Sequence, residues 1–266
     1  MCRFAGYAGP PAPLSTLLGD PPRGLEVQSF SPREQLSGHV NVDGTGLAWW
    51  IDGERRPLRY VSDGPAWSDA NLPHLAPRLR APLQVAVVRS ATPGMPVGGG
   101  ATPPLLDGEL ALAHNGRIET FREQVLAPLL SRLTPAELAR LDVVTDTKLV
   151  LLLLARRRAA RPDEALPRAV AGTLVEVSEV AASSGSFATL NVLVGDGREI
   201  VATRFARGRA ADSLAVLEDG ARWPGAALVA SEPLDDDPRW RRLPEDSLVR
   251  LTPDGRAAVL PFEEAT

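Results

Sequence analysis

The chain has 266 residues, of which 44% are hydrophobic, enough to bury a substantial core in one large domain. Its formal net charge of −4 is small, and its arginines are scattered rather than gathered into a basic stripe, which argues against a nucleic-acid partner. The longest apolar run, residues 149–155, is far shorter than the roughly 18 residues of a membrane span, so no membrane partner is expected.

The single cysteine, Cys2, cannot form an intramolecular disulfide, and no basic stretch followed by an apolar run marks a signal peptide. A cytoplasmic location is therefore expected. The histidines, His39, His74 and His114, lack the spacing of metal ligands, and the glycines at 98–100 are not followed by the residues of a phosphate loop. We expect neither a metal nor a cofactor.

The first half of the chain has the pattern of a sheet. Alternating or β-branched runs predict strands at residues 3–8, 45–51, 56–61, 84–90 and 109–114. Asp52 and Gly53 form a typical hairpin turn between the second and third of these strands. A helical turn is expected near residues 14–19, and the glycine- and proline-rich stretch 94–104 predicts a loop.

The middle of the chain has helical apolar spacing, and the last third returns to strands. Helices are predicted at residues 118–133, 145–160 and 162–182, the second with Thr145 and Asp146 as start signals. A hairpin is predicted over residues 187–205, and further strands at 225–231, 247–253 and 256–262. This order indicates an α+β fold of two sheets with helices packed on them. Without a repeat or a linker, we expect one domain over residues 2–266.

Cys2 stands where a nucleophile can carry its own base. A thiol needs a base or a positive field to be mostly thiolate at neutral pH. If Met1 is removed, as a small second residue allows, the α-amine of Cys2 lies within reach of its own sulfur. Judged by its position alone, Cys2 is better explained as an incidental terminal residue than as a nucleophile. Other motifs must therefore decide between these two interpretations.

Three further motifs lie at predicted strand ends or helix starts: VRSATPG at 88–94, AHNG at 113–116 and TDT at 145–147. With MCR at the start, they resemble the glutaminase fold of class II glutamine amidotransferases, which are N-terminal-nucleophile hydrolases. The resemblance implies a four-layer αββα sandwich of two mostly antiparallel sheets and one glutaminase-type domain. Similarity to a stand-alone branch of the family, the γ-glutamyl hydrolases of ergothioneine biosynthesis, extends over residues 1–18, 64–69, 88–97 and 231–240.

The resemblance implies a role for each motif residue. Cys2 would attack the γ-glutamyl carbonyl and form a thioester. The side-chain amide of Asn115 and the backbone N–H of Gly116 would stabilise the oxyanion, a task typically worth several kcal/mol. Arg89 would bind the α-carboxylate of the glutamyl group, and Asp146 its α-ammonium.

Simpler interpretations of these residues stay open. An Asn-Gly pair favours a hairpin turn, an arginine can simply end a strand, and an aspartate in the first turn stabilises a helix. His114 is expected to be a hydrogen-bonded structural residue rather than a general base, because the α-amine already fills that role.

Other polar residues are candidates for supporting the site. Asn41, with Asp43 and Gly46, resembles a family loop near the nucleophile, although a bare turn explains these residues nearly as well. Asn191 is expected either to help hold the N-terminal amine or to be a core asparagine bonded to backbone.

The chain departs from the family pattern at two positions. The amidotransferases usually carry a histidine two residues before the arginine and a glutamate two residues after the aspartate, where this chain has Val87 and Lys148. The stand-alone branch is looser at the first position, so Val87 fits it. Nothing in the sequence explains Lys148.

The resemblance to the stand-alone branch implies hydrolysis of γ-glutamyl-hercynylcysteine sulfoxide, with a small molecule as the partner. A glutaminase subunit that supplies ammonia to a separate synthetase is one alternative, and a non-catalytic binding subunit is another. The oligomeric state is left open, a homo-oligomer included. Candidate aromatic faces for the trimethylammonium of the substrate are Trp49, Trp50, Trp67 and Tyr7. Trp49 and Trp50, as strand neighbours, are expected to point to opposite faces of their sheet.

Overall fold

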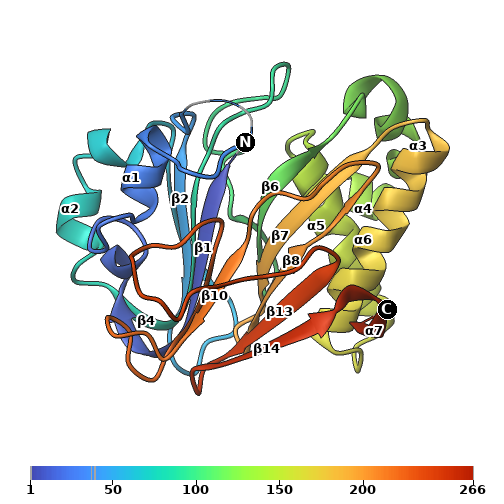
Figure 1. The fold of residues 1–266 in the computed structure, drawn as a ribbon. Coiled ribbons are helices and arrows are strands. Elements are labelled where there is room, and N and C mark those ends of the chain that lie inside the picture. Colours follow the sequence, from blue (N-terminus) through green and yellow to red (C-terminus); the bar gives the residue numbers. More distant parts are fainter. Residues whose placement is uncertain (1, 37, 39, 266) are drawn as a thin grey trace.

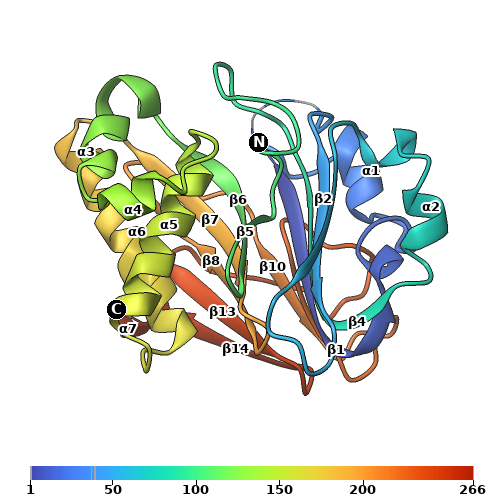
Figure 2. The same cartoon turned by 180° about the vertical axis from the view of Figure 1, so that it is seen from behind.

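The computed structural model describes residues 2–36, 38 and 40–265. Two seven-stranded antiparallel sheets lie face to face, and helices cover the outer face of each (Figures 1 and 2). The result is the four-layer αββα sandwich that the resemblance implied.

The first sheet has β1 at its centre. Its strand order is β12 (Arg241–Arg242), β10 (Ala215–Glu218), β11 (Ala227–Ala230), β1 (Arg3–Pro13), β4 (Arg80–Val88), β2 (Thr45–Trp50) and β3 (Leu58–Ser62). β1 pairs with β11 on one side and with β4 on the other. The N-terminal segment therefore begins between two strands at one end of the sandwich.

The second sheet has β7 and β6 next to each other near one edge. Its strand order is β14 (Arg256–Pro261), β13 (Ser247–Thr252), β8 (Ile200–Arg204), β7 (Ala188–Gly195), β6 (Leu110–Ile118) and β5 (Leu105–Asp107), with β9 (Ala206–Arg207) also paired to β7. β5 pairs with β6 only from Leu110 to Leu112. The outer edge of β6 is therefore not paired with β5 beyond Leu112.

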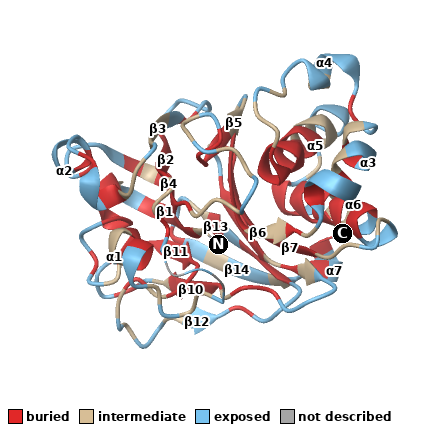
Figure 3. Cartoon of the chain, turned by 90° about the horizontal axis from the view of Figure 1, so that it is seen from above, coloured by how far each residue is buried: buried red, intermediate tan, exposed pale blue. Residues whose placement is uncertain are grey.

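Helices close both outer faces. On the first sheet lie α1 (Leu25–Phe30), α2 (Leu72–Leu75) and two short 3₁₀ turns at Leu14–Thr16 and Ala66–Ser68. On the second sheet lie a π-helical turn (Phe121–Val125), α3 (Leu126–Leu130), α4 (Pro135–Leu138), α5 (Asp146–Ala160), α6 (Leu166–Ser183) and α7 (Phe262–Ala265). Seen from above in Figure 3, buried residues follow the strands and the inner helices, while α4 is largely exposed.

Three apolar cores fill the spaces between the four layers. Because successive strand residues point to opposite faces, Trp50 packs between the sheets whereas Trp49 packs under the helices of the first sheet. The expectation that these two side chains point to opposite faces of the sheet is confirmed.

Two differences from the sequence expectations matter for the site. β6 continues to Ile118, so Asn115 and Gly116 lie inside a strand paired with β7 rather than in a hairpin turn. The helix predicted from residue 118 is therefore wrong at its start. It begins as a π turn after Thr120, whose φ of 46° is left-handed, and its α-helical part ends at Leu130.

Candidate active site

Cys2 immediately precedes β1, at the end of the inter-sheet space. Its side chain is half-buried and packs against the core between the sheets. Its Sγ lies 3.7 Å from the carbonyl oxygen of Ser90. Ser90 is close because Arg3 is paired with Val88, the last residue of β4. Met1 lies outside the described residues, so its removal stays a prediction.

Arg89 follows β4 directly and is almost fully buried. Its Nη2 donates to the carbonyl oxygen of Pro96 at 2.6 Å, which fixes the guanidinium against the following loop. Its Nη1 is buried and has no hydrogen-bond partner among the described residues. A buried cationic donor without an acceptor is costly, so Nη1 of Arg89 is available to donate to an anionic group in the pocket.

Asn115 points between the two sheets, toward the side on which Cys2 lies. Its strand neighbours at alternate positions, Ala111 and Ala113, belong to the inter-sheet core, whereas Leu112 packs on the helical side. Asn115 is fully buried, and neither its Nδ2 nor its Oδ1 has a partner in the described part of the chain. Its amide is therefore free to donate to a bound group.

Gly116 presents its backbone N–H at the open edge of β6. The N–H of Arg117 points toward β7, where it donates to Thr189 Oγ1 at 2.8 Å. Because strand N–H groups alternate in direction, that of Gly116 points the other way, past the end of β5. A Cβ at this position would lie 2.1 Å from the carbonyl oxygen of Thr189, so only glycine fits.

Asp146 is the first residue of α5. Thr145 caps the helix by accepting the N–H of Lys148 at 3.0 Å, as its start signal predicted. Asp146 Oδ1 accepts the N–H of Thr147 at 2.7 Å, while its Oδ2 lies 3.9 Å from Nδ1 of His114. One carboxylate oxygen is thus tied to the helix start and the other faces the site.

His114 is held on both sides of its ring. Its Nε2 lies 2.9 Å from the carbonyl oxygen of Thr189, and its Nδ1 lies 3.4 Å from Thr147 Oγ1. A carbonyl can only accept, so Nε2 carries a proton. The ring links β6, β7 and the start of α5, in keeping with the structural role expected for it.

One pocket gathers the motifs that are far apart in the sequence. It encloses about 400 Å³ of space, part of it open to solvent, and its lining includes Cys2, Arg89, His114, Gly116 and Asp146. Asn115 does not line this pocket but adjoins it from the inter-sheet side. The structure therefore brings together four of the five residues given catalytic or substrate-binding roles from the sequence, along with the supporting candidate His114, and places the fifth, Asn115, next to them.

The other candidate residues are tied into the protein. Asn41 Nδ2 donates to Gln35 Oε1 and to a backbone carbonyl, and the adjacent Asp43 accepts the N–H of Ala91 at 2.8 Å. This loop therefore supports the segment that carries Arg89. Asn191 donates to the backbone oxygen of Asp212 and accepts the N–H of Phe205, so both ends of its amide bond backbone.

Lys148, which the sequence left unexplained, has a partner before the helix. Its Nζ lies 2.9 Å from Oδ1 of Asp142. Although burial opposes it, the ammonium of Lys148 together with backbone donors holds the pKa of Asp142 below its ordinary value. Lys148 therefore ties the loop before α5 to the helix start.

The aromatic candidates do not line the pocket. Trp49, Trp50 and Tyr7 are buried in the cores, and Trp67 lines a separate hollow on the outer side of the first sheet. Those expectations are corrected: packing covers the rings of Trp49, Trp50 and Tyr7, and the exposed Trp67 lies away from the pocket.

No group of three or more His, Cys, Asp or Glu that could hold a metal ion occurs among the described residues, from which His39 is missing. His74 lies on α2, away from the pocket. No helix in the described ranges is long and apolar enough to cross a membrane.

Sequence reasoning missed a second group of polar residues beside Cys2. Arg3, Asp212 and Glu232 are all buried, although charged side chains are rarely so. Arg3 stands in a strand pattern and the two acids stand in loops, so no local signal marks them. Only the packing of the chain shows that they lie in the interior.

Comparison with known proteins gives consistent results. Residues 22–218 match the family model "Glutamine amidotransferases class-II". A protein of Mycolicibacterium smegmatis named γ-glutamyl-hercynylcysteine sulfoxide hydrolase is 36% identical over 262 residues, covering 98% of this chain and 100% of that protein.

Solved structures share the fold. A glutamine aminotransferase class-II domain protein from Silicibacter pomeroyi superposes with a TM-score of 0.70 at 21% identity, covering 98% of this chain and 99% of the other. The glutamine phosphoribosylpyrophosphate amidotransferase of B. subtilis gives a TM-score of 0.64 at 18% identity, with 98% of this chain matching 49% of that one.

Proposed function

We propose that this chain, which belongs to the class II glutamine amidotransferase family, hydrolyses the γ-glutamyl amide of γ-glutamyl-hercynylcysteine sulfoxide, a step of ergothioneine biosynthesis. The observation that carries the proposal is the pocket in which Cys2, Arg89 and Asp146 meet. The leaving group, hercynylcysteine sulfoxide, follows from the name of a relative that matches along its whole length.

Two charged groups select the glutamyl end of the substrate. The free Nη1 of Arg89 donates to the α-carboxylate, and the oxygen of Asp146 that faces the site accepts from the α-ammonium. Both side chains are nearly buried, so each bond forms with little competition from water. The substrate is thereby held with its γ-carbonyl toward Cys2.

The reaction then follows acyl transfer. The α-amine of Cys2 takes the thiol proton, and the thiolate attacks the γ-carbonyl carbon. Asn115 Nδ2 and the Gly116 N–H stabilise the oxyanion. The protonated amine gives its proton to the departing nitrogen, leaving a glutamyl thioester. Water, deprotonated by the same amine, attacks the thioester and releases glutamate and the free thiol.

A second hollow supports a bulky leaving group. It adjoins the first, shares Thr92 and Met95 with it, and encloses about 630 Å³ of space, part of it open to solvent. Its lining includes the acidic residues Glu119 and Glu123 next to Arg117 and Arg122, and Nη2 of Arg117 lies 2.9 Å from Oε2 of Glu119. A carboxylate attracts a trimethylammonium, so the two glutamates can serve the cationic end of the leaving group. Ammonia, the leaving group of glutamine, would need none of this surface.

The test compares glutamate release from the conjugate and from glutamine at equal concentration, with the purified chain and no partner. We expect the conjugate to be used far faster, because remote contacts align the scissile amide. Intact-mass measurement should show that Met1 is absent, and Cys2→Ala should abolish turnover. Glu119→Gln should slow glutamate release from the conjugate roughly threefold, the effect of losing a partly exposed charge pair, and leave glutamate release from glutamine unchanged.

Other outcomes point to other functions. Equal use of both substrates, or use of glutamine only after a synthetase is added, would replace this proposal with the ammonia-supplying alternative. An active protein that retains Met1 would remove the proposed base. No release from either substrate by a folded chain that begins at Cys2 would favour a binding subunit.

A further inference from the structure

A buried carboxylate without a partner lies behind the nucleophile. Asp212 is 1% exposed, and neither of its carboxylate oxygens has a hydrogen-bond partner among the described residues. Arg3 is fully buried, and its three guanidinium nitrogens likewise lack partners there. Burying a charge without hydrogen bonds is expensive, so the carboxylate calls for a donor.

Contacts of the backbone place Asp212 beside the start of β1. Its carbonyl oxygen accepts from Asn191 Nδ2 and from Arg204 Nε, each at 3.0 Å. The next residue, Ser213, donates to the carbonyl oxygen of Ser231, and Ser231 Oγ accepts the N–H of Phe4 at 3.0 Å. Asp212 is thus connected to both sheets at the end where Cys2 lies.

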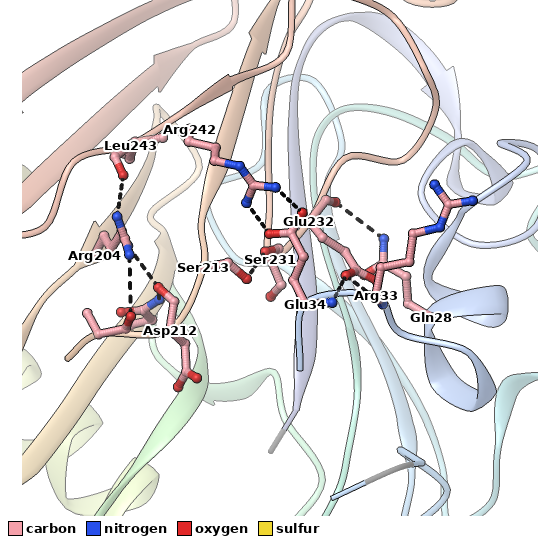
Figure 4. Close-up of polar contacts among 12 residues, drawn as sticks. Gln28, Arg33, Glu34, Arg204, Asp212, Ser213, Ser231, Glu232, Arg242 and Leu243 are labelled. Carbon is pink, nitrogen blue, oxygen red and sulfur yellow. Dashed lines mark hydrogen bonds and ion pairs between the residues drawn. The ribbon is translucent and has the colours of Figure 1, made fainter. Parts of the chain in front are cut away.

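The carboxylate itself points away from these contacts. In Figure 4 no dashed line reaches its oxygens, whereas its carbonyl oxygen is bonded to Arg204. Asn191, which holds the same carbonyl, is paired with Asn115 in the β6–β7 register. The backbone of Asp212 therefore lies on the inter-sheet side, close to the strand pair that carries the proposed oxyanion donor.

Charged groups from several elements act on Asp212. Burial raises its pKa, and this is opposed by Arg3, Arg209 and His114. The other carboxylates that act on Arg3, those of Glu232 and Glu34, are already occupied: Glu232 accepts the backbone N–H groups of residues 33 and 34, and Glu34 is paired with Arg242. Of these three carboxylates, that of Asp212 is the one whose oxygens have no hydrogen-bond partner among the described residues.

Asp212 does not serve the substrate directly. It is absent from the lining of the pocket that contains Cys2, Arg89 and Asp146. A glutamyl ammonium in that pocket already has Asp146 in reach. Arg3 acts on Asp212 through charge alone, without a hydrogen bond between them, so the carboxylate can still accept from a donor on the protein side of Cys2.

We propose that Asp212 is the positioning residue for the α-amine of Cys2, whose N–H its carboxylate accepts once Met1 is removed. The inference rests on the proposed function, in which that amine is the base. When the thiol proton moves to the amine, the carboxylate stabilises the resulting ammonium and keeps it beside the sulfur. The third member of a catalytic triad acts on its histidine in the same way.

The proposal fixes the sign of a pKa change. A neighbouring carboxylate favours the ammonium, so it raises the pKa of the α-amine, and Asp212→Asn should lower that pKa by about 1 unit or more. In the active enzyme the acidic limb of kcat/KM should move to lower pH by a similar amount. The maximal rate should fall roughly tenfold, because the amine is no longer oriented.

The chain is well suited to a direct measurement of this amine. Lys148 is its only lysine, so an amine-reactive reagent can acylate two amines, the α-amine and the side chain of Lys148. In the Cys2→Ala background, which removes the thiol, the rate of acetylation of the α-amine by trace acetic anhydride is followed against pH by peptide mass spectrometry. Lys148 is the internal reference. Asp212→Asn is compared with Glu232→Gln, the matched change at the other carboxylate near Arg3.

We expect the pKa of the α-amine to fall in Asp212→Asn and to stay within about 0.3 units in Glu232→Gln, since the Glu232 carboxylate is bonded to the backbone N–H groups of residues 33 and 34 and not to the amine. Asp212→Ser is the second variant, should the first fail to fold. An unchanged pKa in a folded Asp212 variant, or equal shifts in both variants, overturns the inference even if the enzyme hydrolyses its substrate. The pKa of the α-amine could instead fall in Asp212→Asn while the chain is inactive on every γ-glutamyl amide tried. That result would uphold the inference and refute the proposed function.

Discussion

Replacing Arg89 by lysine tests whether the glutamyl group is bound as proposed. Nη2 of Arg89 donates a hydrogen bond to the carbonyl oxygen of Pro96, whereas its Nη1 is buried and has no partner in the described part of the chain. Lysine retains the charge but has a single nitrogen, which cannot bond the loop carbonyl and the substrate carboxylate in the geometry of a planar guanidinium.

The size of the effect follows from the bond that is lost. A hydrogen bond to a charged group is worth about 1.5–3 kcal/mol, and each 1.4 kcal/mol is a factor of ten. Arg89→Lys should therefore lower kcat/KM by about 10- to 150-fold. The assay is initial-rate glutamate release from the γ-glutamyl conjugate over a range of concentrations.

Arg157→Lys is the matched control for this change. Arg157 lies on α5 outside the pocket and bonds both carboxylate oxygens of Glu164, each at 2.8 Å. This variant loses a bidentate pair of similar geometry but should keep its kcat/KM. A fall of less than about threefold in Arg89→Lys, well under the loss of one charged hydrogen bond, would show that Arg89 is structural. Equal falls in both variants would mean that the loss comes from general destabilisation.

Two further predictions concern side chains whose polar atoms lack partners in the described residues. Asn115→Ala should lower kcat by about 100- to 1,000-fold, as for one oxyanion donor, yet leave the melting temperature close to that of the wild type; a large drop in melting temperature would assign Asn115 to the core instead. In a chain whose α-amine is acetylated, so that no ammonium pairs with the carboxylate, Asp212→Asn should raise the melting temperature more at about pH 8 than at about pH 4. Burial raises the pKa of the Asp212 carboxyl, so the stability that the protonated carboxyl retains at low pH is lost as pH rises through that pKa. Equal shifts at both pH values, measured by calorimetry, would contradict this reasoning.

The sequence by itself determined the features that depend on near neighbours. The start of α5 is set by Thr145, whose side chain caps the helix, and the opposite burial of Trp49 and Trp50 follows from the two-residue repeat of a strand. The family motifs indicated the residues of the pocket, because the chemistry they serve needs a nucleophile, oxyanion donors and a pair of opposite charges.

Tertiary structure alone decided the features that depend on distant partners. Asn115 and Gly116 have the local pattern of a turn, but pairing with β7 extends the strand through them and aims the Gly116 N–H at a free edge. The interior position of Arg3 and Asp212 has no local sign either, since each is buried by segments far away in the chain. Local sequence sets backbone preference and side-chain periodicity, whereas the register between strands and the packing of loops are set by the sum of many long-range contacts, which no short stretch of residues contains.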